Sequence, residues 1–228
     1  MAINKRIADI LRGPDAQQLM SQRQFNELYD LFLTFDKAEV TKLFQQLGVE
    51  PLSFFTGDIP QYAYYHNFGL KDITIKPSIE LIGRSAFSNS GVQTINFDSA
   101  KSLKFIERSA FERCDIKWLL LPFGIKEVAP YVCYECSELE RVELPRSVET
   151  IANNCFEGCE KLTYVYMTNN VKEVRAGAFA DCGIDGNQGL VIDFAGTKTD
   201  AERLIHFCSA SAFDRGTKFN CLDGVTVV

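Results

Sequence analysis

Eight cysteines are the residues of this sequence that most directly suggest chemistry. Cys133 and Cys136 are separated by two residues, and Cys155 and Cys159 are separated by three. Two such pairs resemble a four-cysteine zinc site, in which the metal binds thiolate sulfurs. The alternative is that the thiols are small apolar side chains of a core, because free cysteine is often buried.

Few other residues have the types and spacing that catalysis needs. The chain has two histidines, His66 and His206, which leaves little material for general acid–base chemistry. His206 and Cys208 lie two positions apart on an expected helix and so do not share a face. The glycine-rich segment 183–189 lacks the Lys-Ser/Thr ending of a phosphate-binding loop. We therefore expect no catalytic residue, no metal, no cofactor and no enzymatic activity.

The composition is that of a soluble globular protein. Hydrophobic residues make up 46% of the 228 residues and charged residues 24%, and the formal net charge is −6. A nucleic-acid partner is not expected, because such proteins usually carry a basic surplus. No apolar stretch is long enough to cross a bilayer, and no secretory leader is visible. The expected location is cytoplasmic, or secreted or virion-associated if the chain is processed or exported otherwise.

The amino-terminal part of the chain differs from the rest. Residues 1–50 have apolar residues at helical spacing and two capping-box patterns, which predict a helical segment. Residues 51–69 are rich in phenylalanine and tyrosine. Such a segment is too apolar for a free linker, so we expect a connector that caps the following domain.

From residue 70 the sequence repeats itself with a period of about 23 residues. Each copy has an aliphatic residue, then an aromatic or cysteine five positions later, then Ser or Cys three positions after that. The leading aliphatic residues are spaced by 24, 22, 23 and 23 positions: Ile82, Ile106, Val128, Ile151 and Val174. Alternating apolar pairs, one pair per copy, predict short strands: Ile73/Ile75, Ile95/Phe97, Leu119/Leu121, Val142/Leu144 and Val165/Met167. Stacked copies would form one continuous core.

These repeats resemble the BspA-type leucine-rich repeat family, whose copies combine a strand, a proline and an Ile-Gly-x-x-Ala-Phe-x-x-Cys core. Residues 70–87 follow that pattern closely, and residues 218–227 resemble the Asp-Gly hairpin that ends such proteins. The expected fold is an α/β leucine-rich-repeat solenoid, with repeats over residues 70–196. A helix that begins with a capping box at Thr199 and a hairpin that turns at Asp223-Gly224 form the expected cap over residues 197–228.

The repeat also decides between the two interpretations of the cysteines. Cys136 and Cys159 occupy one repeat position together with Cys114 and Cys182. Stacked equivalents would form a ladder of small buried side chains. We therefore favour a structural role over zinc binding, with the thiols reduced.

The outward positions of the expected strands suggest a binding surface. On three neighbouring strands these positions hold Trp118 and Leu120, Arg141 and Glu143, and Tyr164 and Tyr166. Tryptophan, tyrosine and arginine dominate the energetics of protein interfaces. We therefore expect a non-catalytic module that binds a protein partner, in host–microbe or phage–host interaction. The alternatives are a second copy or the amino-terminal helices on this face, a structural virion or surface component, or an enzyme with a site at the junction of residues 49–69 and the first repeat. The oligomeric state stays open.

Overall fold

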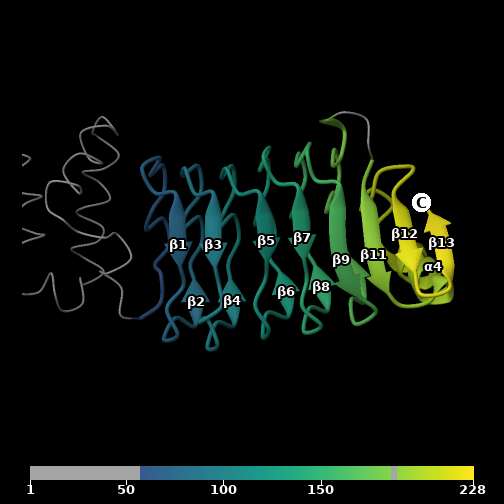
Figure 1. Ribbon diagram of the computed structural model, residues 1–228, viewed down its shortest axis with the longest axis horizontal. Helices are drawn as coiled ribbons and strands as arrows, with labels where there is room; N and C mark the ends of the chain where they lie inside the picture. The colour runs from purple at the N-terminus through teal and green to yellow at the C-terminus, as the bar shows by residue number, and fades with distance from the viewer. Residues whose placement is uncertain (1–56, 186–188) are drawn as a thin grey trace, which may run out of the picture.

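The computed structural model describes residues 57–185 and 189–228 (Figure 1). The expected helical segment 1–50 and the start of the connector lie outside the described residues. The described part is a β-solenoid with a single helix, α4. The α/β class expected from the sequence is therefore too helical for this part of the chain, because each repeat returns through turns and a two-residue strand. No helix of the described residues has the length and hydrophobicity needed to cross a membrane.

One face of the solenoid carries a longer strand from each winding. These strands pair in parallel with in-register neighbours, except where the row is interrupted between β3 and β5. Inward residues such as Leu119, Val142 and Val165 are fully buried, as the alternation predicts. The strands are β1 (Asp72–Thr74), β3 (Thr94–Asn96), β5 (Trp118–Leu120), β7 (Arg141–Glu143), β9 (Tyr164–Thr168) and β11 (Val191–Ala195).

A second face carries one two-residue strand per winding. Each contributes one buried aliphatic residue, which is the leading residue of the sequence repeat. The strands are β2 (Leu81–Ile82), β4 (Phe105–Ile106), β6 (Glu127–Val128), β8 (Thr150–Ile151) and β10 (Glu173–Val174).

The third face consists of tight turns that stack on one another. Each turn places two residues four positions apart in the left-handed region, for example Ser109 and Arg113, or Asn154 and Gly158. This geometry reverses the chain within a few residues. It also directs backbone amides of one turn toward carbonyls of the next winding. The Phe111 amide donates to the Val132 carbonyl at 2.9 Å in this way. The turns therefore link the windings even where the strands do not.

The sequence pattern predicts that the repeats start at residue 70, but in the structure they start earlier. Ile59 pairs with Ile82, and the Tyr64 amide donates to the Ala86 carbonyl at 2.6 Å. The Tyr64 ring also stacks on Phe87 at 5.0 Å between centroids. Residues 59–69 of the aromatic connector thus form part of a winding of the solenoid, with its turn. The pattern is hidden in the sequence because Tyr64 stands at the phenylalanine position and Asn67 at the cysteine position.

Stacked aromatic rings run through the core. Tyr64, Phe87 and Phe111 form one stack, and Phe156, Phe179 and Phe213 form another, with neighbouring centroids 5.0–5.4 Å apart. Cys133 occupies the equivalent position between the two stacks and is fully buried. The preceding residue is Val132, where Phe87, Phe111, Phe179 and Phe213 each follow an alanine. The larger valine offsets part of the volume lost to cysteine.

A helix and a hairpin close the carboxyl end, as expected. Helix α4 (Lys198–Phe207) begins with a capping box, but between Thr197 and Asp200 and not at Thr199. Strand β12 (Lys218–Cys221) pairs in parallel with β11 and antiparallel with β13 (Gly224–Val227), so the hairpin extends the main sheet. The two loop residues are Leu222 and Asp223, one position earlier than expected, because Gly224 with its φ of 135° already pairs with Cys221.

Both rows of strands are interrupted at the same level. β3 does not pair with β5, and β4 does not pair with β6, and Figure 1 shows a wider interval there. Six positions separate Phe97 from Leu103, where the other windings have four, as between Ile75 and Ile79. The two extra residues lie where the chain passes from β3 to β4. Ile95 on β3 is only partly buried, which is consistent with the local opening.

Candidate functional site

The structure brings the six expected site residues together on one sheet. Trp118, Arg141 and Tyr164 are register partners on β5, β7 and β9. Leu120, Glu143 and Tyr166 form the next row on the same strands. Both rows face outward because the residue between them on each strand is buried. We refer to these six residues as the strand face.

The β5 end of the strand face is apolar. Trp118 is 62% exposed and Leu120 is 52% exposed. β5 is also the edge strand of its six-stranded sheet, because the row is interrupted between β3 and β5. A large indole and an isobutyl group thus stand in solvent at the edge of a sheet.

The middle of the strand face is held by charged and aromatic contacts. The Arg141 guanidinium lies 4.2 Å from the centroid of the Tyr164 ring and donates to Glu143 Oε1 at 2.7 Å. The Tyr164 hydroxyl donates to Asp193 Oδ2 at 2.8 Å. Partial burial, followed by this hydrogen bond to Asp193, raises the pKa of Tyr164, so the hydroxyl stays protonated and keeps its role as donor. Side chains fixed in this way lose less conformational entropy when a partner binds.

Asp193 belongs to this network but was not among the expected residues. It lies on β11 and is the register partner of Tyr166. The signal was present in the sequence: Ile192 and Phe194 are another alternating apolar pair, with Asp193 between them. The longer spacing after Cys182 left this pair outside the regular series of strand pairs.

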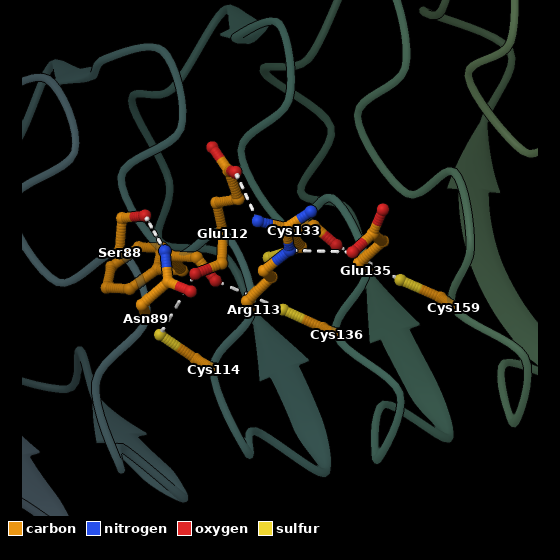
Figure 2. Close-up of polar contacts among 10 residues, drawn as sticks. Ser88, Asn89, Glu112, Arg113, Cys114, Cys133, Glu135, Cys136 and Cys159 are labelled. Atoms are coloured by element: carbon orange, nitrogen blue, oxygen red, sulfur yellow. Dashed lines mark hydrogen bonds and ion pairs between the residues drawn. The ribbon is translucent and has the colours of Figure 1, made fainter. Parts of the chain in front are cut away.

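The cysteine ladder is part of the core, and its thiols act as hydrogen-bond donors. Four Sγ atoms each donate to the carbonyl at the phenylalanine position of the preceding winding. Figure 2 shows Cys114, Cys136 and Cys159 at equivalent places on successive windings. The bonds are Cys114 to Phe87 at 3.0 Å, Cys136 to Phe111 at 3.1 Å, Cys159 to Cys133 at 3.1 Å and Cys182 to Phe156 at 3.2 Å.

This position explains the cysteine spacing without a metal. Burial is the largest cause that raises the pKa of Cys114, Cys159 and Cys182, so these thiols are protonated near neutral pH and are poor nucleophiles. All eight cysteines lie in the described residues and are unpaired. No cluster of three or more potential metal ligands occurs within residues 57–185 and 189–228.

An acidic groove of about 690 Å³ runs across the third face. Its carboxylates come from successive turns: Asp115, Glu135, Glu157, Glu160 and Asp181. Arg113 donates to Glu135 at 2.6 Å, as Figure 2 shows. Burial, followed by the charges of Asp181 and Glu135, raises the pKa of Glu157. Cys114 also lines the groove, but its thiol donates a hydrogen bond to the Phe87 carbonyl and is not positioned to attack a ligand.

The junction proposed as an alternative enzymatic site is packed where it is described. Tyr65 lies edge-on to His66 at 4.1 Å and to Tyr62 at 5.8 Å between ring centroids. These residues form the first turn within the described part of the solenoid. The part of that junction before residue 57 lies outside the described residues.

Comparison with known proteins supports the repeat assignment. The sequence profile of the BspA type leucine rich repeat region matches residues 57–185 in six copies. That range includes the winding that precedes residue 70. The search of curated proteins gives no match.

Several bacterial leucine-rich repeat proteins of known structure are similar to this chain. The Treponema pallidum protein is 24% identical, with a TM-score of 0.54 over 64% of this chain and 71% of the other. A Eubacterium ventriosum protein is 17% identical, with a TM-score of 0.47 over 62% and 52% of the two chains. A Bacteroides ovatus protein is 29% identical, with a TM-score of 0.41 over 54% and 38%.

The likeness to the Treponema protein concerns the fold, and the profile concerns the sequence. Both agree with the repeated windings described above. The profile covers more than half of the 228 residues. This chain belongs to the BspA-type leucine-rich repeat family.

Proposed function

We propose that this chain is a non-catalytic module that binds a partner protein through the strand face. Leucine-rich repeat proteins are in general protein-interaction modules, which supports the class of function. The observation that carries the choice of surface is the exposed pair Trp118 and Leu120 beside the fixed contacts of Arg141. Exposed apolar groups gathered in one patch, with a polar rim, are typical of interaction sites.

The chemistry of the strand face suggests what the partner offers. The exposed Trp118 side chain would fill an apolar pocket of the partner, as an aromatic anchor does in an interface. The arginine and the carboxylates in the middle would exchange hydrogen bonds with polar groups. The proposed partner therefore has an apolar pocket flanked by polar residues, and the proposed setting is host–microbe or phage–host interaction.

The test begins with capture of the partner by the full chain from the source cells, followed by identification by mass spectrometry. Binding is then measured by calorimetry for Trp118→Ala and Tyr166→Ala. We expect each variant to lose about 2 kcal/mol, or roughly thirtyfold in affinity, because truncation of a central anchor typically costs that much.

Phe105→Ala is the matched control. Phe105 is also 62% exposed but lies on β4, on the second face of the solenoid. This variant should bind like the parent. If both strand-face variants bind normally, or if Phe105→Ala weakens binding as much, the strand face is not the site.

A further inference from the structure

Strand β13 ends the main sheet with an open edge. The strand order of that sheet is β13-β12-β11-β9-β7-β5, and no described residue pairs with the outer side of β13. Val225 and Val227 are 51% and 55% exposed. Natural edge strands are usually guarded by lysine, proline or a bulge. Residues 224–228 read Gly-Val-Thr-Val-Val and contain no charged side chain and no proline.

The hydrogen bonds of β13 show which backbone groups point outward. The Val228 amide donates to the Thr217 carbonyl at 3.0 Å, and the Val228 carbonyl accepts from Gly216 at 3.1 Å. Both groups of Val228 therefore face β12. Because this direction alternates along an antiparallel strand, Thr226 also faces β12. The amides and carbonyls of Val225 and Val227 point to the open side.

The outward groups are complementary to those of an identical strand. The segment Val225-Thr226-Val227 reads the same in both directions. A two-fold axis at Thr226 would place Val225 opposite Val227 of a second copy, and Val227 opposite its Val225. Each of these two pairs would exchange two backbone hydrogen bonds, four in all, and would place β-branched side chains side by side. The side chains of residues 224–228 carry no charge, so they add nothing to the repulsion between two net-negative chains.

We propose that β13 pairs antiparallel with β13 of a second copy of this chain and joins two six-stranded sheets into one. The axis of such a pairing is perpendicular to the sheet, so the strand faces of both copies lie on the same side. The proposal does not depend on the function of the strand face. The contact is short, so it is weaker than an interface of standard size, and association should depend on concentration.

The experiment is sedimentation velocity on the full chain over a wide range of concentrations, for the parent and two double variants. Val225→Glu/Val227→Glu places like charges opposite each other across the two-fold axis. Val225→Lys/Val227→Glu places Lys opposite Glu in both pairs. Both variants keep Glu at position 227, opposite Lys218 on β12, so within the hairpin they differ only at position 225, opposite Asn220.

We expect the parent to shift from one chain's mass of 25.7 kDa toward twice that value as concentration rises. The Glu/Glu variant should remain a monomer, and the Lys/Glu variant should associate within about tenfold of the parent. Thermal unfolding at low concentration checks that both variants fold. Hydrogen exchange should show protection of the Val225 and Val227 amides only at high concentration, and of Thr226 at all concentrations.

Three outcomes would overturn the proposal. The first is a parent that stays monomeric at millimolar concentration. The second is a Glu/Glu variant that associates as strongly as the parent. The third is an equal loss of association in both variants, which would show that the pairing of positions 225 and 227 is not in the contact.

Discussion

At the scale of single residues, the cysteine ladder combines packing with hydrogen bonding. The carbonyl of Phe111 accepts the Cys114 amide at 3.2 Å and the Cys136 thiol at 3.1 Å. A carbonyl oxygen has two lone pairs, so the thiol fills the second place. Ser90 stands at the same repeat position one winding before Cys114, and its hydroxyl shares a hydrogen bond with the Cys114 thiol at 3.4 Å.

The variants Cys136→Ala and Cys136→Ser separate these two contributions. Both remove volume, but only serine keeps a donor for the Phe111 carbonyl. We expect the alanine variant to be less stable than the serine variant by about 1 kcal/mol, the usual net contribution of one hydrogen bond. Urea unfolding measures the difference. An alanine variant as stable as the serine variant would show that the thiol acts through packing alone.

Sequence alone predicted the burial of the cysteines but not their bonds. Repeat position placed Cys114, Cys136, Cys159 and Cys182 in equivalent sites. The acceptor is a backbone carbonyl of the preceding winding, and nothing in the sequence marks a particular carbonyl. The same limit applies to the Tyr164–Asp193 bond, because it joins strands whose spacing in the sequence is irregular.

At the scale of elements, strands were easier to predict than turns and caps. Alternation gave the outward residues of β5, β7 and β9, and the register placed them in rows. The start of α4 and the hairpin loop were each misplaced by one or two positions. Thr197 and Thr199 have similar sequence surroundings, and only backbone geometry selects Thr197 as the cap.

A carboxylate in the stacked turns of the third face, Glu157, should make the stability of the protein depend on pH. The pKa of Glu157 is raised, so its charged form destabilises the folded state above that pKa, and the penalty disappears below the ordinary carboxylate value of about 4.3. Glu157→Gln should therefore raise the melting temperature at pH 7. That gain should vanish as the pH falls through this range. Gln also keeps an acceptor for the Asn154 side chain.

Glu138→Gln is the control of opposite sign. Its hydrogen bond with Lys161 lowers the pKa of Glu138, so the charged form favours folding and the benefit is lost as the pH falls. This variant should be slightly less stable than the parent at pH 7 and equal to it in acid. Melting temperatures that move together in the two variants would contradict the assignment of opposite charge effects.

At the scale of the whole molecule, the last repeats depend on the carboxyl-terminal cap. Phe213 stacks on Phe179 at 5.3 Å and lies edge-on to Phe219 at 5.2 Å. It thus continues the aromatic stack into the segment that follows α4. A solenoid needs such a closing element because its final winding would otherwise expose core.

Phe213→Ala should destabilise the protein by about 3–5 kcal/mol, as expected for loss of a buried phenylalanine. Phe207→Ala is the control, because Phe207 is 72% exposed near the end of α4. This change should lie within about 0.5 kcal/mol of the parent. Chemical unfolding measures both. Similar effects in the two variants would mean that the cap does not support the repeats.

The interruption between β3 and β5 gives the solenoid an uneven resistance to stretching. A stack of windings behaves as a row of springs, each joined only to its neighbours. Between these two windings neither row of strands is paired. The backbone hydrogen bonds come from the turns, for example from the Ser109 amide to the Pro130 carbonyl at 3.1 Å. When the two ends of the solenoid are pulled apart, most of the extension should occur at the junction between these two windings. Trp118 on β5 and Phe105 on β4 lie on opposite sides of this junction, so tension would alter the surroundings of these side chains before it disturbs the rest of the molecule.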